Sequence, residues 1–506
     1  MSKTYTRQEV GRHAVEGDMW IIIDNDVYDM STFIDMHPGG AFPILEFAGK
    51  DATDAFYGMH RQEVLLKYKR YKIGTIEGEK AQITIRQPGD LSKVPYAEMS
   101  VFHGYKSPYF NESHYKFQTA ARKFIEEMTA EAQAIDDAGE RPSDEFVQKL
   151  GKSGLLGANI GPGPWLKGVI LPSGLRGEDY DYFHEMILHA EFARWGTPGL
   201  GGGVLGGMSI SLPAVLQFSK PQVRDRVCPD VLVGKKRMAL AITEPYTGSD
   251  VANIKTTAKR TKDGWIVNGV KKWITAGRWA DYFATAVRTE KGISMLLIER
   301  QEGVETKAIK TAYSASAGTA YITFENVFVP FENLLGVEDQ GFKVVLTNFN
   351  HERLMICEGG VAAARLITEE CFKWATQRKV FGKRLIDQPV IRNKLAKMIS
   401  GVESVQNWLE NITYQFSNMT YDEQASKLAG PIALLKYQIT RVEHDVSDDA
   451  CQIFGGRALT KTGMGKYIEC FQRTYKFNAI LGGSEEIMAD LGVRQAMKKY
   501  PLDARL

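Results

Sequence analysis

Residues 240–250 read Leu240-Ala-Ile-Thr-Glu-Pro-Tyr-Thr-Gly-Ser-Asp250, and Lys272-Trp-Ile-Thr275 follows after a short apolar stretch. That stretch carries Asp263-Gly264 and Asn268-Gly269 between short runs of Val, Ile and Trp, a pattern typical of β-hairpins. Short apolar segments continue to Val329-Pro330. The middle of the chain is therefore predicted to be a β domain.

Helical patterns flank this β segment on both sides. From Asn111 onward, apolar residues such as Phe117, Ala121 and Phe124 recur at three- and four-residue steps. Beyond Gly341 the chain is helical again almost to its end. We therefore predict an α+β multidomain protein. Its expected parts are a compact block at 1–78, a linker along a surface at 79–110, a helical domain at 111–238, a β domain at 239–340 and a helical domain at 341–506.

The charges and cysteines narrow the class of protein. The chain has 506 residues with 63 Lys+Arg and 61 Asp+Glu, so its net charge is +2. A charge this small creates no strong electrostatic potential that would favour a nucleic-acid partner. The five cysteines form no CxxC pair, which suits a reducing compartment. The first residues carry no secretory pattern, and we expect no apolar run to approach membrane-spanning length.

One glycine motif is misleading. Gly201-Gly-Gly-Val-Leu-Gly206 satisfies G-x-G-x-x-G, but a helical pattern precedes it. A dinucleotide-binding turn follows a strand. We interpret the run as a flexible loop.

The first block contains His37-Pro-Gly-Gly40, followed by His60. Iron held between two imidazoles needs histidines on opposite walls of a pocket and backbone close to the porphyrin, which glycine permits. With Trp20–Asp29 and Ala48–Phe56, this block resembles the cytochrome b5 family. The resemblance implies haem b with His37 and His60 as axial ligands. The apolar residues that could line the pocket are Phe33, Ile44, Leu45, Phe47, Phe56 and Leu65.

The rest of the chain resembles the acyl-CoA dehydrogenase family. The Thr-Glu-Pro…Gly-Ser-Asp loop and the Trp-Ile-Thr strand carry the resemblance, and three later segments agree: Arg378–Lys383, Gln452–Gly456 and Gly482–Met488. The resemblance implies a helical domain, a central β-barrel domain and a C-terminal four-helix bundle. It also implies bound FAD.

The family pattern assigns residues to the flavin. Around the isoalloxazine ring it places Leu240, Ile242, Thr243, Gly248, Ser249, Trp273 and Thr275. It places Arg378, Phe381, Gln452 and Gly456 on the adenine and pyrophosphate end of FAD in a neighbouring subunit, which implies a homodimer or homotetramer. Ser484 and Glu485 also fall in an FAD-contacting segment.

The chemistry needs a carboxylate that removes a proton α to the thioester. The position that carries this Glu in many members is Gly482 here. A minority of the family carries it on an earlier helix, where this chain has Glu352, with Phe349, Met355 and Ile356 as apolar neighbours. We therefore predict Glu352 as the base. The resemblance assigns Arg353 to the CoA side, Ser249 to substrate contact, and the Gly482 N–H to the thioester oxygen.

The expected reaction is FAD-dependent α,β-dehydrogenation of an acyl-CoA. Glycine at 482 removes bulk near the reacting carbons and favours long or branched chains. The expected electron acceptor is an electron-transferring flavoprotein, O2 or another redox protein. An acyl-CoA oxidase-like enzyme, a nitrogen-oxidising flavoprotein and an inactive flavin fold acting as a haem electron carrier stay open as alternatives. The ending Ala504-Arg505-Leu506 indicates the peroxisome; without that signal we expect the cytoplasm.

Overall fold

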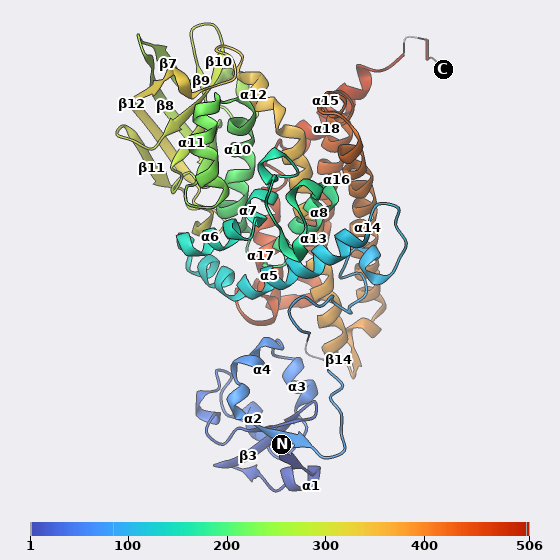
Figure 1. Cartoon of the computed structure of the whole chain (residues 1–506). Helices are drawn as coiled ribbons and strands as arrows, with labels where there is room; N and C mark the ends of the chain where they lie inside the picture. The colour runs from blue at the N-terminus through green and yellow to red at the C-terminus, as the bar shows by residue number, and fades with distance from the viewer. Residues whose placement is uncertain (1–2, 84–85, 502, 505–506) are drawn as a thin grey trace. The chain divides into compact units, whose positions relative to one another are not determined.

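The computed structural model describes residues 3–83, 86–501 and 503–504, so Arg505 and Leu506 lie outside the described residues. Figure 1 traces the chain. The first of two compact units joins Met1–Gln87 with Glu369–Ala396 and Ala450–Glu469; the second holds Pro88–Thr368, Lys397–Asp449 and Cys470–Leu506. Parts of the C-terminal helices thus cluster with the first block, which the sequence pattern alone does not predict.

A five-stranded sheet supports the N-terminal domain. Its strand order is β1-β5-β4-β3-β2, and β1 and β5 are parallel. The strands are β1 (Lys3–Tyr5), β2 (Ala14–Val15), β3 (Asp18–Ile23), β4 (Asp26–Asp29) and β5 (Lys72–Ile76). Short helices accompany it: α1 (Arg7–Val10), α2 (Phe42–Glu46), α3 (Thr53–Tyr57) and α4 (Glu63–Lys67).

The sheet has an apolar cluster on each face because successive side chains of a strand point in opposite directions. Ile21 and Ile23 on β3 join one cluster, which contains Phe33. Ile22, between them, joins the other, which contains Val10. Helices α2–α4 pack against the first cluster, to which Ile44, Phe56 and Leu65 contribute.

Helices form most of residues 112–232. The first begins where the periodicity predicts, because the Asn111 side chain accepts a hydrogen bond from Ser113 N at 2.9 Å and caps it. The helices are α5 (Glu112–Ala138), α6 (Asp144–Lys152), α7 (Leu155–Ala158), α8 (Tyr182–Ala193), α9 (Pro198–Gly201), α10 (Gly207–Phe218) and α11 (Pro221–Leu232).

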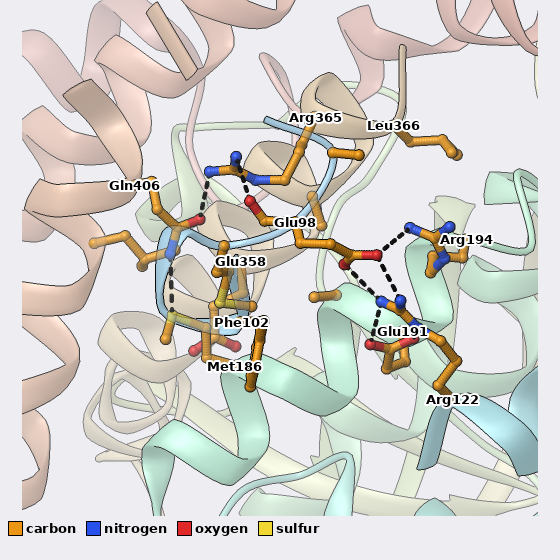
Figure 2. A pocket seen from close by; sticks show the side chains of 15 residues that line it. Glu98, Phe102, Arg122, Met186, Glu191, Arg194, Glu358, Arg365, Leu366 and Gln406 are labelled. Carbon is orange, nitrogen blue, oxygen red and sulfur yellow. Dashed lines mark hydrogen bonds and ion pairs between the residues drawn. The ribbon is translucent and has the colours of Figure 1, made fainter. Parts of the chain in front are cut away.

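A buried ion network ties the segment before α5 to this helical domain (Figure 2). Arg122 on α5 donates from Nη2 to Glu98 Oε2 at 2.8 Å and from Nε to Glu191 Oε2 at 2.8 Å. All three side chains are buried. The expectation that residues 79–110 lie along a surface is therefore wrong around Glu98. A charge at this depth is tolerated only when it is paired.

The glycine run at 201–206 is helical. Gly202–Gly206 forms a π-helical turn between α9 and α10. A Cβ on Gly203 would lie 2.3 Å from Ser316 O, so glycine lets the two backbones pack closely. The prediction of a flexible loop is wrong, while the helix that precedes the run agrees with our rejection of a dinucleotide-binding turn.

The combined helix Pro198–Phe218 also corrects a prediction. It has 21 residues, and an 18-residue window within it has a mean hydropathy of 1.5, so the helix is long and apolar enough to cross a membrane by length and composition alone. The expectation that no apolar run approaches that length is therefore wrong. The window is 72% buried inside the protein, as is usual for a core helix.

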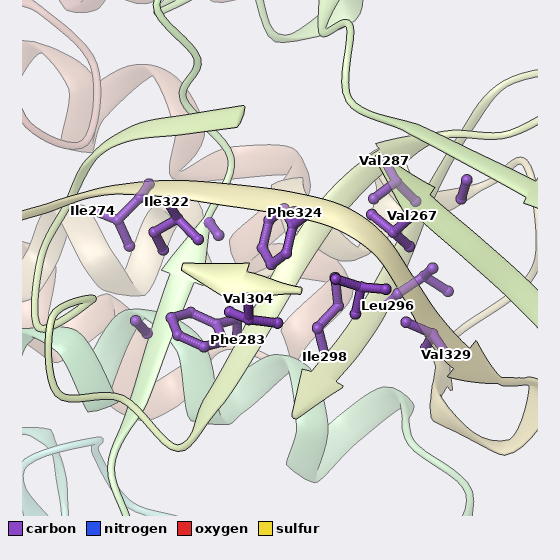
Figure 3. Packing of buried hydrophobic residues seen from close by; sticks show 14 of the residues in the cluster. Val267, Ile274, Phe283, Val287, Leu296, Ile298, Val304, Ile322, Phe324 and Val329 are labelled. Atoms are coloured by element: carbon purple, nitrogen blue, oxygen red, sulfur yellow. The ribbon is translucent and has the colours of Figure 1, made fainter. Parts of the chain in front are cut away.

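The β domain is one eight-stranded sheet with the order β11-β12-β8-β7-β9-β10-β13, and β6 pairs with β9. The described pairings do not close into a ring, so the expected barrel is open. Figure 3 shows the aliphatic and aromatic side chains of its core, including Phe283 and Phe324. The strands are β6 (Met238–Ala241), β7 (Thr257–Arg260), β8 (Gly264–Ile274), β9 (Tyr282–Arg288), β10 (Ile293–Glu299), β11 (Val304–Ala308), β12 (Ala320–Pro330) and β13 (Leu334–Leu335).

Of the two predicted hairpin turns, one is present. Asp263-Gly264 stands at the β7–β8 turn, but Asn268-Gly269 lies inside β8. Gly269 has φ +149°, and a Cβ there would lie 2.6 Å from Thr256 Cα. The glycine therefore serves a close backbone approach opposite a bulge in β12, not a turn.

The C-terminal region is helical, as expected. Its elements are α12 (Gly341–Thr347), α13 (Phe349–Gln377), α14 (Pro389–Asn418), α15 (Tyr421–Lys427), α16 (Ala429–Phe454), α17 (Lys466–Thr474) and α18 (Glu485–Met497), with the hairpin β14 (Lys379–Val380) and β15 (Lys383–Arg384).

The buried network predicts a large effect of Arg122→Gln on stability. Two buried carboxylates would lose the arginine that they share, and the charged contact that would remain is the weaker one of Glu98 with Arg194 at 3.9 Å, so the free energy of unfolding should fall by about 3–5 kcal/mol. Lys116→Gln, on the same helix, breaks the exposed pair with Glu112 and should leave the free energy of unfolding nearly unchanged, because water and salt screen both charges. Urea unfolding of both variants measures the difference; equal midpoints would contradict the assigned role of the network.

Candidate active site

Glu352 on α13 meets Gly482, on the turn before α18. A Cβ at Gly482 would lie 3.7 Å from Glu352 Oε1 and 2.7 Å from Ile356 Cδ1. The two positions that the sequence analysis compares as alternative places for a base therefore face the same space. Ile356 supplies the apolar contact that the helical spacing predicts.

The surroundings change the acidity of Glu352. Burial raises the pKa of this carboxyl from its ordinary 4.5 to about 7, while the nearby charges of Arg353, Lys436 and His351 act to lower it. A carboxylate with a pKa near neutrality is a far stronger base than an exposed one, and it is still ionised in a large share of molecules at neutral pH.

The Gly482 turn is fixed from two sides. Arg353 Nε donates to Gly482 O at 3.2 Å, and Lys436 Nζ donates to Gly483 O at 2.7 Å and to Asn478 O at 2.8 Å. Gly482 has φ +61°, which glycine adopts without strain. Among the described residues the Gly482 N–H donates to no protein acceptor, so this turn presents a backbone donor beside the Glu352 carboxylate.

Sequence reasoning missed Lys436. The side chain is fully buried, and burial lowers its pKa to about 8. The one available signal is its place in an apolar run, Ile432-Ala-Leu-Leu-Lys436. A lysine on a helix is normally exposed, and only the fold shows that its target is the carbonyl groups of the turn.

A cavity of about 780 Å³ lies beside this site. Arg353 and His351 from α13 line it together with Lys343 of α12, and Trp165 and Phe342 supply apolar surface. Mixed apolar walls with a few cationic groups suit a long ligand with an anionic end. Arg353, assigned to the CoA side by the family pattern, thus reaches both the Gly482 turn and this cavity.

Two buried histidine–carboxylate pairs lie in the same helical region. His351 Nε2 and Glu185 Oε1 are 2.8 Å apart, and His189 Nδ1 and Glu358 Oε2 are 2.5 Å apart. Burial raises the pKa of Glu358 to about 7. A metal between a nitrogen and an oxygen at about 2 Å from each would hold them about 3.3 Å apart, so the His189–Glu358 contact is a hydrogen bond and not a coordination geometry.

His114, Asp181 and His184 form a separate histidine–carboxylate cluster, and helix capping explains why they lie together. His114 and His184 each accept from a backbone N–H in the capping boxes of α5 and α8. Asp181 caps α8 by accepting from Phe183 N, and its carboxylate lies 3.1 Å from His114 Nε2. These residues hold two helix ends together.

The loop of residues 240–250 is pinned by a buried ion pair that the sequence analysis missed. Lys271 Nζ donates to Glu244 Oε1 at 2.8 Å and to Ile242 O at 2.9 Å. Thr256 N and Lys255 N donate to the two Glu244 oxygens at 2.9 and 2.6 Å. Both charged side chains are buried. The Glu of the Thr-Glu-Pro segment thus holds the shape of the loop, because both of its carboxylate oxygens accept hydrogen bonds from protein donors.

The predicted flavin-ring residues lie on this loop and on β8. Trp273 is 51% exposed and adopts φ +64°, a strained conformation for a tryptophan. Gly248 and Ser249 are also exposed, and the loop meets β8 where Lys272 N donates to Thr243 O at 2.8 Å. The remaining residues of this set are buried or half-buried: Leu240, Ile242, Thr243 and Thr275.

The predicted adenine-end residues belong to the first compact unit. Phe381 is 96% exposed and has φ +51°, Gln452 and Gly456 are exposed, and Arg378 is half-buried. In the second unit, Ser484 caps α18 by accepting from Ile487 N, and the adjacent Glu485 is buried, 3.5 Å from Arg441.

In the N-terminal domain, His37 and His60 face each other with ring centroids 5.9 Å apart. Each Nδ1 bonds a backbone carbonyl: His37 to Gly40 O at 2.8 Å and His60 to Phe56 O at 3.2 Å. These bonds leave each Nε2 free to bind iron, since an imidazole ligand is usually oriented by a bond at its other nitrogen. The two residues therefore fit a bis-histidine iron site.

The walls around these histidines are apolar. Phe33 and Ile44 are buried in the adjoining core, and Phe47, Phe56 and Leu65 pack against it. Leu45, predicted with them, is 43% exposed. A Cβ on Gly39 would lie 2.8 Å from His37 Cε1, so the His-Pro-Gly-Gly turn needs glycine to bring its backbone beside the ring.

Known family models match the domains that carry the Glu352 site and the His37–His60 site. Residues 6–77 match the cytochrome b5-like heme/steroid binding domain. Residues 111–235, 239–327 and 339–497 match the N-terminal, middle and C-terminal domains of acyl-CoA dehydrogenase.

Individual proteins similar to this chain are also acyl-CoA dehydrogenases. The acyl-CoA dehydrogenase apdG of Emericella nidulans is 38% identical over 82% of this chain and 98% of its own length. The mitochondrial long-chain specific acyl-CoA dehydrogenase of Sus scrofa is 28% identical over 76% of this chain and 87% of its own length. The crystal structure of acyl-CoA dehydrogenase from Geobacillus kaustophilus superposes with a TM-score of 0.69 at 25% identity, covering 77% of this chain and 100% of that one. The chain therefore belongs to the acyl-CoA dehydrogenase family, and a cytochrome b5-like domain precedes its dehydrogenase domains.

Proposed function

We propose that the protein oxidises the α,β bond of a long or branched acyl-CoA to the trans-2-enoyl-CoA, with Glu352 as the base. The observation that carries the proposal is the Glu352 carboxylate beside Gly482, in surroundings that raise its pKa to about 7. Similarity to a long-chain specific enzyme supports the chain length, as does the missing side chain at Gly482.

Glu352 takes the proton from the α carbon of the thioester. The Gly482 N–H donates to the thioester oxygen, where negative charge develops as that proton leaves. Arg353 and Lys436 hold the Gly482 turn by its carbonyl groups, so the donor is positioned before the substrate arrives. Arg353 also lines the cavity of about 780 Å³ that would receive the CoA side of the substrate.

FAD, when bound, would supply the acceptor for the hydride that leaves the β carbon. The exposed edge formed by Gly248, Ser249 and Trp273 would meet the flavin ring, and Ser249 would also touch the substrate. We assign the exposed Phe381, with Arg378, Gln452 and Gly456, to the adenine end of FAD in a second copy of this chain, which makes the protein a homodimer or homotetramer.

His37 and His60 would hold a b-type haem in the b5-like domain. A haem held there would carry one electron at a time whereas the substrate gives up two, so an outside acceptor would have to complete each cycle. An electron-transferring flavoprotein, another redox protein or O2 can fill this role. We propose a peroxisomal location from Ala504-Arg505-Leu506.

Anaerobic mixing of the purified protein with a panel of acyl-CoAs tests the reaction. Flavin absorbance should bleach within one turnover, fastest with long or branched chains, and a ferrous haem spectrum should follow. A protein that bleaches with no acyl-CoA but with an amine or nitroalkane would overturn the proposal in favour of nitrogen oxidation.

Glu352→Gln should slow flavin bleaching by about 10²–10⁴-fold, because the base is lost. Its stability should rise at the same time. The wild-type carboxyl must ionise while buried, and this cost is absent at pH 4.5, grows as the pH rises towards about 7, and reaches at most about 3 kcal/mol above that. Thermal unfolding should show the variant more stable than wild type at pH 8 and equal to it near pH 4.5.

Replacing either axial histidine tests haem binding independently of flavin reduction. His37→Ala and His60→Ala should each abolish the b-type spectrum of the purified protein, while acyl-CoA still bleaches the flavin at the wild-type rate. His13→Ala, a histidine of the same domain that pairs with Asp18, is the matched control and should keep full haem. Full haem content in both axial variants would refute the ligand assignment.

A further inference from the structure

Arg61, the residue directly after His60, makes a buried ion pair inside the first compact unit. Its guanidinium donates from Nη1 and from Nη2 to the two carboxylate oxygens of Glu370 on α13, with the Nη2 bond at 3.3 Å. The side chains are 16% and 5% exposed. A two-pronged contact of this kind fixes direction as well as distance.

Two more contacts join the same pair of surfaces. The Arg61 guanidinium lies 4.8 Å from the ring centre of Tyr467 on α17. Lys379 Nζ on β14 lies 2.5 Å from Asp54 Oδ2 on α3, on the outer edge of the contact. Three separate segments of the dehydrogenase part, α13, β14 and α17, therefore contact Arg61 and α3 in the b5-like domain.

The burial of the Arg61–Glu370 pair determines how much it contributes to the contact between the two surfaces. An exposed pair such as Asp54–Lys379 contributes little, because water and salt screen both charges. The Glu370 side chain is 5% exposed, and without Arg61 its carboxylate would keep only the Lys373 ammonium of the same helix, 3.4 Å away, as a charged partner. The ion pair therefore favours the arrangement in which Arg61 and Glu370 are in contact over arrangements in which the b5-like domain is detached.

We propose that Arg61 is the docking residue of the b5-like domain, which anchors the His60 side of its haem site to Glu370 and Tyr467 at the end of the C-terminal helices. The docking itself depends on neither cofactor. Its consequence, faster electron transfer to the haem, rests on the proposed function.

Charge exchange tests the docking. Arg61→Glu and Glu370→Arg each place like charges in contact, whereas the double variant Arg61→Glu/Glu370→Arg restores a pair with the signs exchanged. Arg70→Glu is the matched control, because Arg70 is an exposed arginine of the same domain whose contact is with Tyr71. Arg61→Gln serves if a charge reversal does not fold. Small-angle scattering gives the radius of gyration, and anaerobic mixing with an acyl-CoA gives the rates of flavin bleaching and haem reduction.

Both single variants should enlarge the radius of gyration and slow haem reduction by about tenfold, with flavin bleaching and the oxidised haem spectrum unchanged. The double variant should recover most of both effects, and Arg70→Glu should match wild type. Single variants with the wild-type radius and haem rate would overturn the proposal, as would a double variant no better than the singles. If no acyl-CoA bleaches the flavin, the proposed function fails, and the radius of gyration still decides the docking.

Discussion

A carboxylate kept out of water is the constraint on which the candidate site depends. Glu352 lies where α13 faces the Gly482 turn, and burial there raises its pKa to about 7. The same burial makes its ionised form costly, so the rest of the site must hold the turn without neutralising the base. Arg353 and Lys436 do this by directing their hydrogen bonds to the carbonyl oxygens of Gly482, Gly483 and Asn478.

Other buried charges have a similar role elsewhere in the fold. Lys271 and Glu244 fix the loop that would lie along the flavin, and Arg122 joins the segment before α5 to α8 through Glu98 and Glu191. Each group is costly alone and tolerable only as part of its set. Such pairs set the positions of loops, and the shape of the site follows from those positions.

Much of this could be predicted from the sequence where the signal is local. Asn111 marks the start of α5, and the spacing of His37 and His60 within the b5-like pattern predicts two facing imidazoles, which the structure has. Glu352 could be singled out because Gly482 lacks a side chain, and the structure brings the two together. The roles of the flavin-contacting residues stay predictions.

What the sequence could not predict depends on contacts between distant segments. Lys436 resembles a surface lysine until its carbonyl partners are placed around it. Asn268-Gly269 has the composition of a turn, yet Thr256 presses against it within β8. Arg61 and Glu370 give no local sign of each other, since pairing between remote charges leaves no periodic pattern in a single sequence.

The measurement that tests the central claim most directly is the pH dependence of flavin bleaching in a single turnover with one acyl-CoA, for wild type and Glu352→Asp. The account predicts a wild-type rate that falls as the pH drops through about 7, where Glu352 becomes protonated. The shorter carboxylate should be slower and should have its own inflection. A wild-type rate that is constant from pH 5 to 9, or a Glu352→Asp profile identical to it, would contradict the assignment of Glu352 as the base.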